Sequence, residues 1–128
     1  MANVKRQNIT YLGYNTFMFL ESISKSLSHH AYLLEGSVSL NEELISILEN
    51  RHKIPSKGNL DLIDRSYTTF SIDDARELKS LHETKPVSED SKKIFVITFE
   101  GITVEAQNAL LKLLEEPNDY AIFFLIVP

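Results

Sequence analysis

The chain has 128 residues and a formal net charge of −5 at pH 7, and hydrophobic residues make up 43% of it. This length and balance suit one globular domain with a core of its own, so we expect a single domain over residues 1–128. The chain contains no cysteine, which excludes a disulfide scaffold and a zinc site with thiolate ligands. It also lacks the basic excess with which a domain binds nucleic acid on its own.

The first half of the sequence predicts two helices and two strands from the spacing of its apolar residues. The polar segment between the second helix and the second strand contains Pro55 and Gly58 and is predicted to be a loop. The predicted elements are a helix over 14–28, a strand over 31–35, a helix over 40–50 and a strand over 60–64.

In the second half, capping residues accompany the apolar patterns. Ser71 and Asp74 resemble a capping box at the start of a helix that runs to about His82. Thr103 can cap the next helix, which ends before Pro117. A charged turn over 88–93 follows the first of these helices. Strands are expected over 94–99, before the Thr103 helix, and over 122–127, after it. The former is apolar without alternation, which is typical of a strand covered on both faces.

This alternation predicts an α/β fold of three layers, in which helices cover both faces of a parallel sheet of about four to five strands. The longest apolar run, residues 121–128, is too short to span a membrane. The first residues lack the apolar stretch of a signal peptide. We therefore expect a cytoplasmic protein with no membrane partner.

In folds of this kind ligands bind at the carboxyl ends of the strands, and the loop after the first strand is the natural phosphate site. A P-loop reads G-x-x-x-x-G-K-[ST]. Here only Gly36 fits, and Asn41 and Glu42 stand where the second glycine and the lysine would be. Because the carboxylate would repel a triphosphate, we interpret this segment as a simple strand-to-helix turn.

Other residues give weaker signals for a site. Glu100 is the only acid near the end of the most apolar strand, where a nucleotide hydrolase holds its metal ion, and a solvated loop residue is the plainer interpretation. His29 and His30, at the end of the first predicted helix, would point in different directions, while His52 and His82 are isolated polar residues. We therefore expect no catalytic residue, no metal and no cofactor.

The segment from Asn108 to Pro117 reads Asn-Ala-Leu-Leu-Lys-Leu-Leu-Glu-Glu-Pro. It closely resembles the N-A-L-L-K-x-L-E-E-P helix of bacterial DNA polymerase III clamp-loader subunits. Segments 30–34, 71–79 and 92–97 also resemble that family in their order, so the resemblance covers about residues 28–128. It implies a sheet of the P-loop NTPase (AAA+) type.

Within that family the sequence is most similar to delta-prime subunits, which do not bind ATP productively. When the helix motifs are aligned, the two Walker B acids fall on Ile97 and Thr98, and the sensor hydroxyl falls on Val127. The resemblance therefore implies a non-hydrolysing scaffold. Such a subunit would help the other clamp-loader subunits to place the sliding clamp on primed DNA.

Lys112 lies on the helix that faces the DNA in related loaders, which makes it a candidate DNA or partner contact. The plainer expectation is a solvated side chain paired with Glu115 or Glu116, three or four residues further along the helix.

The sequence also departs from the family. The segment 50–59 is short and contains no cysteine, so it cannot form the four-cysteine zinc module of many family members. The Ser-Arg-Cys motif, the helical lid and the collar domain have no counterpart within residues 1–128. Two other interpretations remain. The first is an ATP-binding hydrolase with an atypical site, in which Lys53 or Lys57 would replace the P-loop lysine. The second is an unrelated α/β interaction domain.

Overall fold

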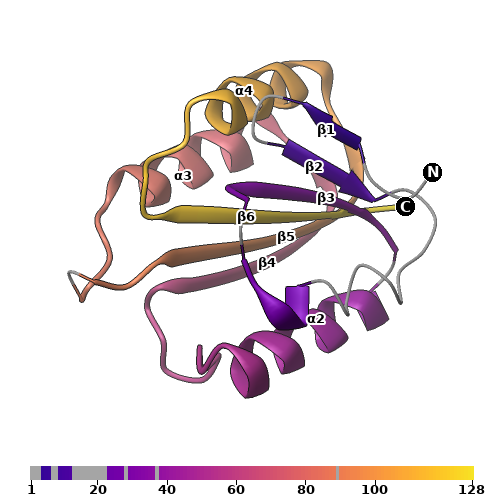
Figure 1. Cartoon of the computed structure of the whole chain (residues 1–128). Coiled ribbons are helices and arrows are strands. Elements are labelled where there is room, and N and C mark those ends of the chain that lie inside the picture. The colour runs from indigo at the N-terminus through magenta and orange to yellow at the C-terminus, as the bar shows by residue number, and fades with distance from the viewer. Residues whose placement is uncertain (1–3, 7–8, 13–22, 28, 37, 89) are drawn as a thin grey trace.

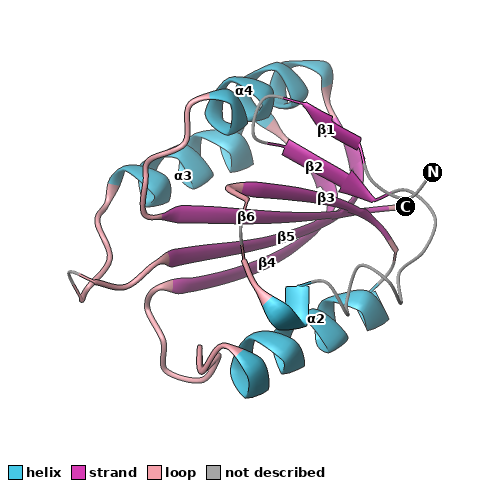
Figure 2. Ribbon diagram, viewed as in Figure 1, coloured by secondary structure: helices cyan, strands magenta, loops and turns pink. Residues whose placement is uncertain are grey.

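The computed structural model describes residues 4–6, 9–12, 23–27, 29–36, 38–88 and 90–128. These residues form one sheet with helices on both faces: α3 and α4 lie on one side of it and α2 on the other (Figure 1, Figure 2). The strands are β1 (Val4–Arg6), β2 (Ile9–Leu12), β3 (Ala31–Glu35), β4 (Leu62–Phe70), β5 (Lys93–Ile102) and β6 (Ala121–Val127). The helices are α2 (Val38–Arg51), α3 (Ile72–Glu83) and α4 (Val104–Glu115).

The strand order is β1-β2-β3-β6-β5-β4, and β2 to β6 are all parallel, whereas β1 pairs with β2 in the antiparallel sense. The predicted α/β fold with a parallel sheet between two helical layers is therefore confirmed. The expected number of four to five strands was too low, because β1 and β2 were not predicted. These strands have only three and four residues, and segments so short depend on pairing with a neighbouring strand.

The core consists of two apolar layers, one on each face of the sheet. Between the sheet and helices α3 and α4, the rings of Phe95 and Phe123 stack with centroids 4.7 Å apart. On the α2 side, Tyr32 stacks on Phe124 at 5.0 Å. Successive residues of β5 and β6 enter opposite layers, which explains why both strands are apolar along most of their length.

Each long helix buries one face, as its apolar spacing predicted. The buried residues are Leu40, Leu44 and Leu48 of α2 and Ala106, Leu110 and Leu114 of α4. Three further residues of the predicted faces, Ile47, Ala109 and Leu113, are only partly buried. Among the described residues, every helix is too short or too polar to traverse a lipid bilayer.

Both predicted helix caps are confirmed. At the start of α3, the Asp74 carboxylate accepts from the Ser71 N–H at 2.9 Å, and the Ser71 hydroxyl oxygen accepts from the Asp74 N–H at 3.4 Å. At the start of α4, the Thr103 hydroxyl oxygen accepts from the Ala106 N–H at 3.2 Å. These bonds satisfy N–H groups that have no partner within their own helix.

Several predicted boundaries were wrong, including the end of β5, which lies at Ile102 and not at residue 99. Strand β4 continues to Phe70, well beyond the predicted segment 60–64, because it is an edge strand whose exposed positions carry polar residues. Strand β5 begins at Lys93, which the sequence assigned to a turn. Of the predicted helix over 14–28, residues 14–22 and 28 lie outside the described residues. Residues 23–25 are helical and residues 26, 27 and 29 are not, so His29 and His30 do not directly follow a helix.

Candidate functional site

The candidate site is the carboxyl edge of the parallel sheet, where the loop after β3 would hold phosphate groups. Strand β3 ends at Glu35 and α2 begins at Val38, so the connection has only two residues. The Gly36 N–H donates to the carbonyl of Val127, the last residue of β6, at 2.8 Å. A P-loop instead directs several successive N–H groups into one concave turn around the phosphates. A two-residue connection with one N–H bound to β6 lacks the length for such a turn.

Gly36 has a packing role at this position. A Cβ atom added to Gly36 would lie 2.4 Å from Cδ2 of Leu40. Leu40 is buried, because it anchors the first turn of α2 against the sheet. The close approach of Leu40 therefore accounts for the glycine without any phosphate group, since a Cβ at this position would force the Leu40 side chain to move.

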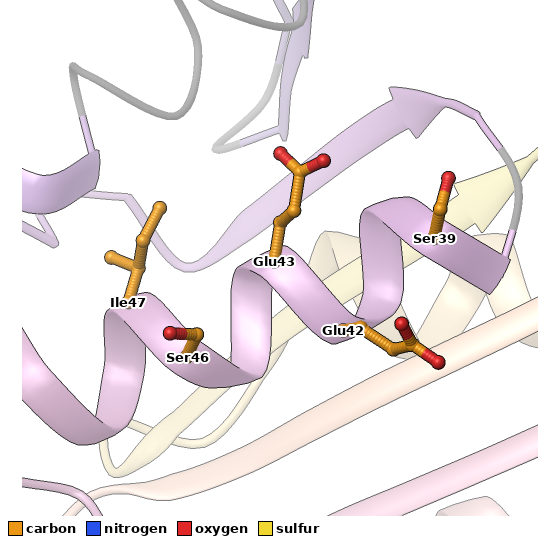
Figure 3. Close-up of a pocket in the computed structure, with 5 residues that line it drawn as sticks. All are labelled: Ser39, Glu42, Glu43, Ser46 and Ile47. Carbon is orange, nitrogen blue, oxygen red and sulfur yellow. The ribbon is translucent and has the colours of Figure 1, made fainter.

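Asn41 and Glu42, the other two positions of the degenerate loop, lie one turn into α2. The Asn41 amide donates to a carboxylate oxygen of Asp64 at 2.9 Å, which ties α2 to β4. Glu42 is exposed and lines a shallow depression of about 480 Å³ on α2. Figure 3 shows the side chains that line it, Ser39, Glu42, Glu43, Ser46 and Ile47. With two carboxylates and no Lys or Arg, this lining would repel a phosphate group.

The two positions aligned with the Walker B acids lie within β5. Ile97 is fully buried between the sheet and helices α3 and α4. Thr98 is 8% exposed, and its hydroxyl oxygen makes no hydrogen bond within the part of the chain that the structure describes. Neither side chain carries the carboxylate with which a Walker B strand holds magnesium.

Glu100 follows these positions in β5 and is exposed at the carboxyl edge. Within the described residues, no three His, Asp or Glu side chains gather closely enough to hold a metal ion. Since hard cations such as Mg²⁺ take several oxygen ligands, Glu100 alone does not form a metal site.

Three of the four histidines contribute to the packing of β3 and the segment before it. The His29 N–H donates to the hydroxyl oxygen of Tyr32 at 3.1 Å, and the His30 carbonyl accepts from the backbone of β6 at 2.8 Å. A ring nitrogen of His52 contacts the carbonyl oxygen of Ile23. These contacts give each of the three histidines a structural role.

The match to a known family settles the broad identity of the domain. A family model described as "DNA polymerase III, delta subunit" matches residues 50–128. The chain belongs to this family. The helix motif from Asn108 to Pro117 lies within the matched residues, whereas the segment 30–34 lies outside them. The resemblance to DNA polymerase III clamp-loader subunits is thereby confirmed.

A solved structure is similar to this DNA polymerase III delta subunit family member along most of the chain. It is the crystal structure of a DNA polymerase III gamma subunit-related protein from Thermotoga maritima, with a TM-score of 0.65 and 27% sequence identity. The match covers 88% of this chain and 39% of that chain, so this chain spans well under half of the Thermotoga protein. A search among curated proteins gave no match.

In this family member, packing accounts for the apolar residues of the helix motif. Leu110 and Leu114 are buried in the core, and Ala109 and Leu113 pack against it. Lys112 is exposed on the outer face of the helix. The core therefore requires the apolar positions of the motif but does not require the lysine.

Lys112 lies in a groove of about 410 Å³ between α3 and α4. The groove is lined by Lys79, His82, Glu83, Ala109, Lys112, Leu113, Glu116 and Asn118. The expected pairing of Lys112 with Glu115 or Glu116 is wrong: within the described residues, the one ion pair joins Arg76 to Asp73. The ammonium group of Lys112 is thus available to a partner.

His82, which the sequence indicated to be an isolated polar residue, is buried at the floor of this groove with 4% of its surface exposed. Its Nε2 accepts from the Asn118 N–H at 2.8 Å. The His82 carbonyl accepts from the Tyr120 hydroxyl at 2.9 Å and from the Asn118 amide at 3.2 Å. Burial lowers the pKa of His82; nearby Glu83 opposes this shift and Lys93 adds to it.

Lys93 completes this cluster from the first position of β5. It is 4% exposed, and its ammonium group donates to the carbonyls of Leu81 at 2.6 Å and Thr84 at 2.8 Å. Burial lowers the pKa of Lys93, and Asp61 opposes this shift. The cluster satisfies carbonyl groups at the end of α3 that have no partner within the helix. The only sequence signal for it was a lysine directly before an apolar strand.

Proposed function

We propose that this domain is a non-hydrolysing, delta-prime-like clamp-loader subunit. It acts as a scaffold: it packs against other clamp-loader subunits, which hydrolyse ATP and place the sliding clamp on primed DNA. The observation that carries this proposal is the two-residue connection between β3 and α2, which leaves no turn to surround a triphosphate.

Three separate features of the same edge support this proposal. Leu40 fills the space beside Gly36, which accounts for a glycine at this position without a phosphate group. Glu42 and Glu43 place negative charge on the exposed side of α2. Thr98 supplies a neutral hydroxyl where a metal-binding acid would be required. Neighbouring residues could compensate for a single atypical residue. Here the phosphate-binding turn, the P-loop lysine and the metal-binding acid are all absent from their positions, which together favours a scaffold.

The alternative of an atypical ATP hydrolase requires Lys53 or Lys57 to act near Gly36. Lys53 follows the far end of α2, and a helix of 14 residues is about 20 Å long. The Lys53 ammonium group donates to the Asn50 carbonyl at 3.4 Å, at that same far end. Both lysines come after α2 in the chain, whereas a P-loop lysine stands at the start of this helix. This arrangement argues against the alternative.

Reconstitution of clamp loading tests the proposal. A loader would be assembled from the same organism's subunits with and without this chain, and clamp loading on primed DNA and ATP turnover would be measured. We expect loading to require the chain, and the chain alone to hydrolyse no ATP. ATP turnover by the isolated chain, or full loading without it, would contradict the proposal.

We further propose Lys112 as the residue of this domain that contacts DNA or a neighbouring subunit. Its support is its exposure and its lack of an ion pair within the described residues. The acidic net charge of the chain limits such a contact to a local one, made within the assembled loader.

A further inference from the structure

A second groove, of about 400 Å³, lies at the carboxyl edge of the sheet, beside α4. Its floor includes Leu33 of β3, Phe99 of β5 and Leu125 of β6, and its wall is formed by α4. Leu33 is only partly buried although β3 lies inside the sheet. We name this surface the α4 groove.

An exposed apolar stripe of α4 extends the α4 groove. Leu111 lines the groove and is 44% exposed. Val104, seven residues earlier on the same side of the helix, is 72% exposed. The core does not enclose either residue, whereas Leu110 and Leu114, which also line the groove, are buried. Apolar side chains that gather along one groove, instead of standing singly, are typical of an interaction site.

The charge of the α4 groove indicates what kind of partner fits it. Among the described residues that line it, Glu100 is the one charged residue, and its side chain is exposed. A second copy of this chain would bring the same acid and a net charge of −5 to the contact, and DNA would bring phosphate groups, so both are disfavoured by like-charge repulsion. A segment with an apolar anchor next to a Lys or Arg matches both the apolar floor and the acid.

We propose that the α4 groove docks an apolar segment, flanked by a Lys or Arg, of a neighbouring clamp-loader subunit. This inference rests on the proposed function, because it assumes that the domain joins such an assembly. The anchor side chain of the partner lies between Leu111 and the ends of β3 and β6, and its basic neighbour lies beside Glu100.

Binding measurements with charge-changing variants test the docking site. The probe is the purified ATP-hydrolysing clamp-loader subunit of the same organism, titrated against the labelled chain. Leu111→Lys removes the apolar contact and adds a charge that repels a basic partner, while Glu115 at i+4 supports a lysine in the helix. Leu60→Lys is the matched control, since Leu60 is 79% exposed and precedes β4 at the opposite edge of the sheet.

We expect Leu111→Lys to weaken binding at least tenfold and Leu60→Lys to leave it within twofold. Glu100→Lys is expected to weaken binding several-fold and to reduce its dependence on salt concentration. Thermal melts of all variants would confirm that each one folds. A photo-crosslinker at position 111 gives an independent readout and is expected to label an apolar segment of the neighbour next to a basic residue.

The outcomes separate this inference from the proposed function. If the unmodified chain binds the neighbouring subunit and Leu111→Lys binds equally well, the docking site is wrong and the scaffold proposal stands. Crosslinks from position 111 to a second copy of this chain, or to other parts of the same chain, would also overturn the docking site. If the unmodified chain binds no clamp-loader subunit, both proposals fail.

Discussion

At the carboxyl edge of the sheet, Leu40 packs beside Gly36 in the connection after β3, and Glu42 and Glu43 line a depression on the following helix, α2. At the amino edge, by contrast, His82, Lys93 and Asn118 form a buried polar cluster around the end of α3. The fold would place a ligand at the first of these regions. Two strongly buried titratable groups, His82 and Lys93, nevertheless lie at the second.

This contrast shows that a cluster of titratable groups does not by itself indicate a reaction site. Buried ionisable groups with shifted pKa values are often found at functional sites. Here most hydrogen bonds of the cluster join its side chains to backbone groups at the end of α3 or at the turn before β6. The cluster therefore has a structural role, whereas the surfaces that we propose for binding are the exposed Lys112 and the α4 groove.

The amino-edge cluster predicts the largest effect on stability. His82→Ala leaves the Asn118 N–H without its acceptor and removes a buried ring, so we expect a loss of about 3 kcal/mol in the free energy of unfolding. Lys79→Ala, an exposed change in the same groove, is the control and is expected to stay within about 0.5 kcal/mol. Urea denaturation measures both. Equal stabilities would mean that the cluster does not hold α3 in place.

The carboxyl edge predicts a smaller loss when Gly36 gains a side chain. Gly36→Ala places a Cβ against Leu40, and such overpacking costs about 1–3 kcal/mol. Gly101→Ala is the matched control, because the nearest atom to its Cβ would be 3.8 Å away. We expect the control to be neutral or slightly stabilising in the same urea titration. A fully stable Gly36→Ala variant would show that the connection has free space.

The lowered pKa of His82 predicts how stability depends on pH. Below about pH 6.5 the unfolded chain binds a proton on this ring that the folded chain does not yet bind. The contribution of His82 to the free energy of unfolding is therefore fully present above pH 6.5. It decreases as the pH falls below 6.5, and the decrease ends below the lowered pKa of the folded state. Urea titrations at neutral and mildly acidic pH measure this fall. His82→Gln should remove most of it, and an unchanged fall would assign it to other groups.

Lys112→Ala is expected to change the stability of the domain least, within about 0.5 kcal/mol, because the side chain is exposed. Its effect should instead appear in the assembled loader, as weaker binding to primed DNA with a shallower dependence on salt concentration. Lys79→Ala, in the same groove, serves for comparison. An unchanged salt slope would exclude Lys112 as a DNA contact.

The sequence predicted the central strands and the capped helices because their signals are local. The apolar run of β5 and the pairs Ser71 with Asp74 and Thr103 with Ala106 are each complete within a few neighbouring residues. The short strands β1 and β2 were missed because they depend on pairing within the sheet. The predicted β4 ended too early because the polar second half of this strand is stabilised by pairing with β5.

The candidate site was predictable only where it depends on residue type. Glu42 and Thr98 could be recognised from the sequence as unsuitable for phosphate and metal binding. The packing of Leu40 on Gly36 could not, since it depends on how α2 approaches the sheet. Similarly, the contact of His82 with Asn118 joins residues 36 positions apart, and no local pattern indicates it.

Titration of the isolated chain with labelled ATP in the presence of magnesium tests the central claim most directly. The account predicts no saturable binding, at least into the millimolar range, because the β3–α2 connection offers neither a phosphate-binding turn nor a lysine. Saturable, magnesium-dependent binding at micromolar concentration, weakened by substitutions at Gly36 or Asn41, would contradict it.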